Sequence, residues 1–440
     1  MLAAGLMLIA TFATTAIINA QVISFGMRKL AHSANQFGLD LMRAMDRSDA
    51  TMAFCPFCIS SSLIMLLMGA HGNTASSLRH ALYLWGMQRS EINLASYDMM
   101  NHLGVNLPNN NQLHSVGFFP AVMSDPRMSS SLSSSILSGN DIVFMNNIYV
   151  QREFVVNYHY HLLLQRYYKT AVHPLDFIHS GHETRQHINA IVEKQTAGKI
   201  KHILPERVTP STQLLLLSAL YFKGTLDLNI SLARKPINNK PRNVFGQDPI
   251  MLEAKHVRIR YGFNRYLNCT TIEMPFKGGL ITLVAVMPND PNGLDTLLTR
   301  LSAQVLSDVI NGLEVKRVSV KMPRISFEAG NRNLSMALSN MGLADLFKPG
   351  YSQLYDISDY KWLHVSDIIH KTYLDIKEND EPNNNHNNNK NSKSHQKLSD
   401  SVDVNFDKPF LFFIMDSISG LILAMGKIGR EPVNYRLPIN

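Results

Sequence analysis

The chain has 440 residues, of which 45% are hydrophobic and 17% are charged, and its formal net charge is +8. This length suffices for one large core or for two domains, and three cysteines are too few for a disulfide framework, so the core must hold the fold. The positive charge is spread along the chain without any RNA- or DNA-binding motif, so we expect no nucleic-acid partner.

The first twenty residues are mostly apolar and carry no charged side chain. They predict a signal peptide over residues 1–20, cleaved after Ala20 or after Ala16, although no Lys or Arg precedes the apolar run. A retained signal anchor is the alternative, because the run nearly reaches the length that spans a membrane. Three glycosylation sequons, which begin at Asn229, Asn268 and Asn333, agree with a secretory route. We therefore expect a secreted, extracellular glycoprotein that is free of the membrane after cleavage.

The first part of the chain is predicted to be mainly helical. Apolar residues at helical spacing predict an amphipathic helix over residues 30–45, and Pro56 suits the first turn of a buried apolar helix. Another helix is predicted over residues 75–84. Between residues 104 and 140, runs of Asn and Ser with interspersed Pro follow neither a helical nor a strand period, which indicates a surface insertion.

Strands dominate the later part of the chain. Strands are predicted over 142–151, 214–222, 317–327, 372–376, 410–415 and 422–428, with two more between 270 and 287 joined at Lys277-Gly278-Gly279; helices are predicted over 154–168, 187–204, 294–306 and 334–341. Because helices concentrate early and strands late, the order indicates an α+β fold with an antiparallel or mixed sheet.

A polar stretch separates two of the predicted strands. Seven asparagines lie between residues 383 and 391, and Ser, Lys and His follow them. Such a segment cannot bury enough apolar surface to offset its ordering entropy, so we expect an exposed loop over residues 379–404. A long loop of this kind is either functional or a tolerated Asn-rich insertion.

Nine short motifs follow one another in a fixed order, and together they extend over about residues 30–434. The motifs are FCPFCISS from Phe54, GNT from Gly72, IN with the following Glu193, Thr196 and GKI from Ile188, ALYFKG from Ala219, MPRI from Met322, MGL from Met341, VSDIIHK from Val365, KPFLF from Lys408 and GKI from Gly426. The chain thus resembles a serpin. The resemblance implies one serpin domain over residues 21–440, with three β-sheets, eight or nine helices and an exposed reactive loop after Glu378.

The inhibitory mechanism that the resemblance implies requires small residues at the start of the loop, and this loop lacks them. An inhibitory serpin is cleaved in its loop, and the freed loop inserts as a new central strand, so its first residues must be small. Here the hinge after Glu378 contains Asp380, Glu381, Pro382 and Asn383. A buried unpaired polar group costs about 1–3 kcal/mol, and Pro lacks the N–H that a central strand needs. We expect a non-inhibitory protein or a poor inhibitor; the alternative is a suicide inhibitor of a trypsin-like serine protease.

The resemblance places the scissile bond only approximately. Counting forward from the hinge reaches Ser394, and counting back from the KPFLF motif reaches Leu398. Lys393 and Lys397 bracket these positions and suit a trypsin-like protease, whose specificity pocket is acidic. Lys390 stays open as a third candidate.

The resemblance also implies a region in which the main sheet opens. Its candidate residues are Arg324, His370, Ser218, Cys58 and Leu226. Leu226, Ser218 and Cys58 stand where the family usually has Trp, Asn and Ser, whereas His370 matches a buried histidine that bridges the central strands. Arg324 and Glu378 match a basic–acidic pair, so we expect a salt bridge between them.

Other chemistries fit the sequence less well. Cys55-Pro-Phe-Cys58 resembles a redox dithiol at a helix start, but no thioredoxin-like βαβ unit surrounds it, so we interpret it as two small buried residues. His182 and His187 are one residue too far apart for the zinc-protease helix motif. There is no nucleophile elbow and no phosphate-binding glycine loop. We expect no enzyme activity, no metal and no cofactor.

The densest basic group comprises Lys255, His256, Arg258, Arg260 and Arg265. If it lies on one strand face, this basic group suits a weak contact with a sulfated polyanion; a solvated strand face is the alternative. The expected partner is otherwise a trypsin-like serine protease, and the expected state is a monomer.

Overall fold

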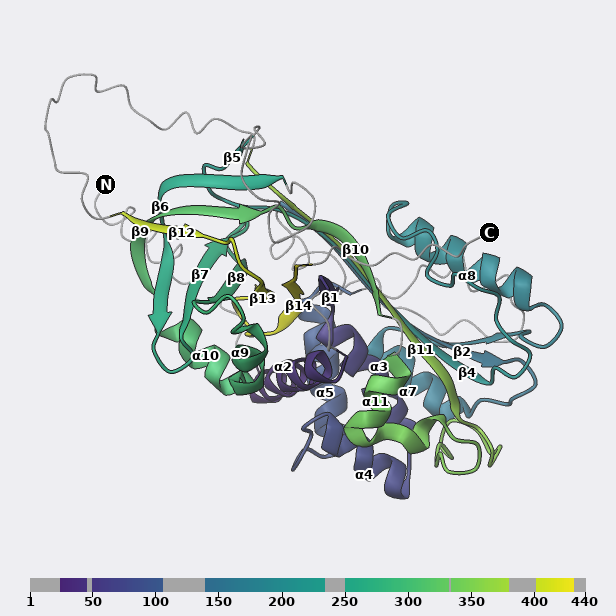
Figure 1. Cartoon of the computed structure of the whole chain (residues 1–440). Coiled ribbons are helices and arrows are strands. Elements are labelled where there is room, and N and C mark those ends of the chain that lie inside the picture. The colour runs from purple at the N-terminus through teal and green to yellow at the C-terminus, as the bar shows by residue number, and fades with distance from the viewer. Residues whose placement is uncertain are drawn as a thin grey trace, which may run out of the picture.

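The computed structural model describes residues 24–45, 50–105, 139–233, 250–331, 334–379 and 401–430, and their strands form two hydrogen-bonded sheets (Figure 1). The helices are α2 (Phe25–Met45), α3 (Pro56–Gly69), α4 (Gly72–Ala81), α5 (Arg89–His102), α7 (Tyr158–Tyr168), α8 (Gly181–Gln195), α9 (Leu294–Arg300), α10 (Ala303–Asn311) and α11 (Leu334–Leu338), followed by the π-helical η2 (Ser339–Leu343) and the 3-10 helix η3 (Ala344–Phe347).

A five-stranded sheet runs in the order β10-β11-β4-β2-β3. Its strands are β2 (Asn140–Gln151), β3 (Val172–Leu175), β4 (Leu214–Thr225), β10 (Ser326–Asn331) and β11 (Val365–Lys377). The two central strands, β4 and β11, are parallel, whereas β10 pairs with β11 and β2 pairs with β4 in antiparallel fashion. No loop strand therefore separates β4 from β11 in this form of the protein.

A nine-stranded sheet contains the remaining strands. These are β1 (Met52–Phe54), β5 (Ser231–Ala233), β6 (Met251–Asn264), β7 (Cys269–Pro275), β8 (Ile281–Pro288), β9 (Glu314–Pro323), β12 (Val402–Asn405), β13 (Phe410–Asp416) and β14 (Ile422–Ile428). The described strands thus form two sheets where three were expected, because β6 and β9 stay paired on both sides of a bulge between Ala254 and Val257. The strand β12 follows the Asn-rich segment and pairs parallel to β9 at the sheet edge.

Helix α3 lies at the centre of the molecule. All of its residues are buried, and it contacts α2, α4, α7, β2, β4 and β14. A helix that is apolar all round must be covered on every side, which explains this position. Helix α8 lies on the other face of the five-stranded sheet, as Figure 1 shows, where Ile188 and Val192 join a second apolar cluster with Met145 and Leu217.

The α+β fold with mixed sheets is confirmed, and the differences from the predicted elements have local causes. The strand predicted over 317–327 is divided between β9 and β10, because the chain passes from one sheet to the other at Pro323-Arg324. The helix predicted over 187–204 begins earlier, at Gly181, and ends earlier, at Gln195, because Ala197 and Gly198 just after it both have left-handed backbone angles. Ser302 caps α10 and so divides the helix predicted over 294–306. The predicted insertion over 104–140 lies mostly outside the described residues.

Among the described helices, none combines the length and the apolar character that crossing a membrane requires.

Candidate functional site: the central seam of the five-stranded sheet

The central seam is the parallel pair of β4 and β11, whose register runs from Val365 opposite Leu214 to Lys377 opposite Thr225. Its side chains alternate, as strand geometry requires. The residues of β11 that are buried face the α3 side, and those between them are partly exposed. On the partly exposed face, the rings of Tyr221 and Tyr373 stack across the seam at a centroid distance of 5.7 Å.

His370 joins the two strands of the seam to the start of α3. It lies opposite Ser218 in the register, and its Nδ1 is 2.8 Å from Ser218 Oγ. Its Nε2 accepts the backbone N–H of Cys55 at 2.9 Å and lies 2.8 Å from Thr372 Oγ1. The predicted bridging histidine is therefore in place, and it contacts three neighbours that carry no charge.

The hydrogen bonds and burial of His370 fix its protonation. A backbone N–H can only donate, so Nε2 is an acceptor and the ring proton lies on Nδ1, where it donates to Ser218 Oγ. Burial lowers the pKa of His370 to about 3, because a charged imidazolium at this position would lose its hydration. The ring is therefore neutral at physiological pH.

Cys55 and Cys58 form a disulfide at the first turn of α3, with a Cα–Cα distance of 5.3 Å. Cys55 is the N-cap residue, and its sulfur accepts the backbone N–H of Cys58. The sulfur of Cys58 lies 3.9 Å from the carbonyl oxygen of Ala219 on β4. The sequence interpretation of two small buried residues is right about their burial, but it left the disulfide unpredicted.

At the upper end of the seam, which is formed by the C-terminal ends of β4 and β11, a hydrogen bond and a packed side chain hold the two strands together. The backbone N–H of Leu226 donates to the carbonyl oxygen of Lys377 at 2.9 Å, so the chain just after β4 is tied to the last residue of β11. The Leu226 side chain is fully buried, and its backbone forms an isolated bridge with Phe276. A leucine therefore fills the place that a tryptophan has in the family.

The expected salt bridge between Arg324 and Glu378 is not formed. Arg324 Nη2 instead lies 3.2 Å from Asp375 Oδ1, which also accepts a hydrogen bond from Ser326. Asp375 lies opposite Ser326 on the neighbouring strand, and Ser326 is two residues from Arg324, so Asp375 and Arg324 share one face of the sheet. Glu378, three residues after Asp375, is on the opposite face by the same alternation. The buried Oε2 of Glu378 and Nε of Arg324 have no hydrogen-bond partner among the described residues.

Most of the predicted loop residues lie outside the described part of the chain. This applies to Asp380, Glu381, Pro382 and Asn383 of the hinge, and to all scissile candidates from Lys390 to Leu398, which include Lys393, Ser394 and Lys397. Their roles stay predictions. The described flanks are consistent with a loop between β11 and β12, because these strands belong to different sheets.

Other predicted sites show no built binding geometry. Asn229 and Asn268 are exposed, and Asn333 lies outside the described residues. In the basic group on β6, Arg260 forms an ion pair with Glu273, which offsets part of its charge. The predicted polyanion contact therefore stays a prediction. The described residues contain no cluster of side chains able to hold a metal ion.

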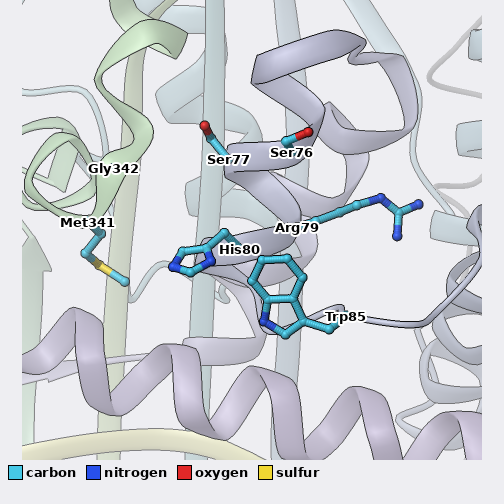
Figure 2. A pocket seen from close by; sticks show the side chains of 7 residues that line it. All are labelled: Ser76, Ser77, Arg79, His80, Trp85, Met341 and Gly342. Atoms are coloured by element: carbon cyan, nitrogen blue, oxygen red, sulfur yellow. The ribbon is translucent and has the colours of Figure 1, made fainter.

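A surface hollow lies away from the seam, between α4 and η2 (Figure 2). The edge-to-face pair of His80 and Trp85 faces Met341 across it, with a centroid distance of 4.8 Å between the two rings. Trp85 is 57% exposed. Nη1 of Arg79 donates a hydrogen bond to the carbonyl oxygen of Met87, which is not among the residues that line the hollow.

The comparisons with known proteins agree with this geometry. A family model described as Serpin (serine protease inhibitor) matches residues 32–430. The chain belongs to the serpin family. Serpin B13 of Mus musculus is 25% identical over 406 residues, covering 91% of this chain and 99% of that protein. Leukocyte elastase inhibitor A of the same species is 25% identical, with 91% and 99% covered.

Two solved serpin structures share the fold. A crystal structure of maspin covers 93% of this chain and 100% of its own, with 20% sequence identity and a TM-score of 0.74. Uncleaved ovalbumin covers 91% and 99%, with 20% identity and a TM-score of 0.69. At 20% sequence identity, this structural similarity shows the shared fold and does not show a shared function.

The relatives overturn one expectation, namely secretion. They include Serpin B13, Serpin B10 of Homo sapiens and Intracellular coagulation inhibitor 2 of Tachypleus tridentatus, and this group points away from a secreted protein. The predicted extracellular localisation is therefore wrong. It rested on the apolar character of residues 1–20, which lie outside the described residues, and on sequons, which occur by chance.

Sequence reasoning missed a buried polar pair far from the seam. His102 Nε2 lies 2.7 Å from Asp416 Oδ2, and both side chains are almost fully buried. Burial raises the pKa of Asp416, but hydrogen bonds from His102 and Ser419 outweigh it, so the net shift is downward. The two residues are 314 positions apart, and no local pattern could have joined them.

Proposed function

We propose that this serpin-family protein is cleaved in its loop as a substrate, near Lys393 or Lys397, and does not trap the protease. A trypsin-like serine protease is the proposed partner, because both candidate positions are lysines. One observation carries the proposal: among the residues that the structure describes, the buried face of the central seam offers no cation to a carboxylate that would enter it.

The surroundings of an inserted strand would be apolar in the upper half of the seam. Leu374 and Ile376 of β11, and Leu220 and Phe222 of β4, are at most 1% exposed. The polar groups farther along this face are hydroxyls and the neutral ring of His370. A hinge strand would have to place its side chains among these groups.

The nearby lysines cannot neutralise an entering carboxylate. Lys223 Nζ pairs with Asp141 at 3.0 Å, and Lys371 Nζ pairs with Glu328 at 2.8 Å. Both lysines occupy partly exposed positions that alternate with the buried ones. A buried charge without a partner costs several kcal/mol, so the entry of Glu381 is opposed.

The remaining hinge residues add to this opposition. Asn383, two positions after Glu381, would face the same side and cost about 1–3 kcal/mol if unpaired. Pro382 has no backbone N–H, so an inserted strand that contains it would lack one of the hydrogen bonds to its neighbouring strand. Insertion must be faster than hydrolysis of the acyl-enzyme, and barriers at the first inserted residues slow the step that decides the outcome.

A working inhibitor is the second candidate, and a specific observation favours it. The strands β4 and β11 are parallel and pair directly with each other. The cleaved loop could therefore enter between them as a strand antiparallel to both. The name of Leukocyte elastase inhibitor A also describes that relative as an inhibitor. On this reading the loop would insert in spite of its hinge.

Thermal unfolding before and after cleavage tests the proposal. The protein is nicked with a Lys-specific protease, the new N-terminus is identified by mass spectrometry, and the melting temperature is measured by circular dichroism. We expect cleavage after Lys393 or Lys397 and an unchanged melting temperature, because the freed loop stays outside the sheet. Incubation with trypsin should yield cleaved protein without a covalent adduct that survives denaturation.

A hinge variant provides the matched control. Glu381→Thr, Pro382→Ala and Asn383→Ala together replace the opposing residues by small ones, and nicking this variant should raise its melting temperature. A large rise in the unaltered protein, or a denaturation-resistant adduct with trypsin, would overturn the substrate proposal in favour of the inhibitor.

A further inference from the structure

The disulfide between Cys55 and Cys58 lies directly beneath the central seam. Both residues are fully buried, and their Cα distance of 5.3 Å is ordinary for a disulfide. They occupy the N-cap and the first turn of α3, whose residues are buried throughout. The pair is therefore part of the packed core.

This short turn contacts both strands of the seam. The backbone N–H of Cys55 donates to His370 Nε2 on β11, and the sulfur of Cys58 lies 3.9 Å from the carbonyl oxygen of Ala219 on β4. His370 in turn donates to Ser218 on β4. A change in the position of either cysteine is thus passed to the groups that hold β4 and β11 together.

Breaking the disulfide requires space that this site lacks. Bonded sulfurs are about 2.05 Å apart, whereas non-bonded heavy atoms prefer about 3.5–4.0 Å. Phe57 and Ile59 around the turn are at most 2% exposed, and close-packed interiors accommodate added volume only by shifting neighbours. The two thiols must therefore displace the turn of α3, the seam, or both.

We propose that the Cys55–Cys58 disulfide is a redox latch that holds the central seam closed, and that a dithiol reductant releases it. In the exchange, the S–S bond between the two cysteines breaks and a new S–S bond forms in the reductant. Two electrons pass from the reductant to the cysteine pair, and the two protons of its thiols end on Cys55 and Cys58.

The burial of the latch also distinguishes it from a redox catalyst. A catalytic dithiol needs at least one accessible sulfur, and both sulfurs here belong to fully buried residues. A reductant reaches them only when the seam opens, so opening and reduction favour each other. The latch acts on the sheet whether or not the cleaved loop inserts, so it is independent of the proposed function.

Amide hydrogen exchange of the full chain tests the latch. Cys269 is the other cysteine and is buried, so the experiment uses a Cys269→Ala background in which only the pair can change. The protein is compared before and after treatment with dithiothreitol, with thiols counted by alkylation. We expect exchange in β4 and β11 to become several-fold faster on reduction, while β7 and β8 are unchanged.

A matched variant separates the disulfide from other effects of the reductant. Cys55→Ser with Cys58→Ser cannot form the bond, so its exchange should be insensitive to dithiothreitol. Equal exchange of β4 and β11 in the oxidised and reduced protein would overturn the proposal. So would alkylation that finds both thiols free in protein purified under oxidising conditions, and these two readouts do not depend on the variant folding.

Discussion

The free energy of unfolding should fall as the pH drops below about 6.5, and His370 should be a main cause. The unfolded chain has an ordinary histidine pKa of about 6.5, whereas burial holds the pKa of His370 at about 3 in the folded protein. Between these values the unfolded state binds a proton that the folded state does not bind. The stability contributed by the neutral ring is therefore complete above pH 6.5 and is lost as the pH falls towards 3.

The magnitude follows from the width of this window. Each pH unit below the unfolded pKa costs about 1.36 kcal/mol, so the loss at about pH 5 is roughly 2 kcal/mol. The groups that contact the ring belong to Ser218, Thr372 and Cys55 and carry no charge, so none of them offsets this loss.

A variant that lacks only His370 isolates the effect. Urea unfolding of the wild type and of His370→Gln is followed by circular dichroism between about pH 7.5 and about pH 5, because glutamine can donate and accept but cannot titrate. The stability difference between the two proteins should shrink by roughly 2 kcal/mol over this range. His173, whose pKa burial lowers to about 4, is common to both proteins and cancels. Parallel pH profiles would refute the reasoning.

Three further predictions concern the core and the upper seam. Asp416→Asn should cost about 3 kcal/mol in urea unfolding at neutral pH because it breaks a buried pair, and this difference should diminish as the pH falls below about 3.9, where the unfolded wild-type chain binds a proton that the folded carboxylate, with its lowered pKa, does not bind; an unchanged stability would contradict the pairing. Gly426→Ala should cost about 2 kcal/mol more than Gly330→Ala, since the new Cβ meets a carbonyl oxygen of β1 at 2.2 Å in the first case and only a lysine side chain at 3.5 Å in the second; equal midpoints would show that β1 yields. A double-mutant cycle of Arg324→Gln and Asp375→Asn should give a coupling of about 1 kcal/mol, and zero coupling would argue against their ion pair.

Short-range patterns in the sequence were sufficient to predict several of the helices and strands. The largely apolar run after Pro56, interrupted only by Ser60, Ser61 and Ser62, specified a buried helix, and α3 is that helix. The alternation over residues 372–376 specified a half-buried strand, and β11 contains it. The order of nine motifs was enough to specify the family, because those residues meet local demands of turns, caps and strand faces.

Boundaries were less predictable where the chain changes its surroundings. The stretch predicted as one strand over 317–327 alternates up to Met322 and again from Ile325, and its two halves join different sheets. The disulfide of Cys55 and Cys58 was left open for a related reason. A spacing of three fits both free and bonded cysteines, and only the turn geometry at the start of α3 brings the sulfurs together.

The pairing of polar groups depends on contacts between distant parts of the chain and could not be predicted from local patterns. Family resemblance suggested Glu378 as the partner of Arg324, and the register between β10 and β11 supplied Asp375 instead. His102 meets Asp416 across 314 positions of sequence. Local periodicity indicates which face of a helix or strand is buried. The partner of a buried charged group depends instead on strand order and register. Strand order and register are set when the whole chain packs into its core.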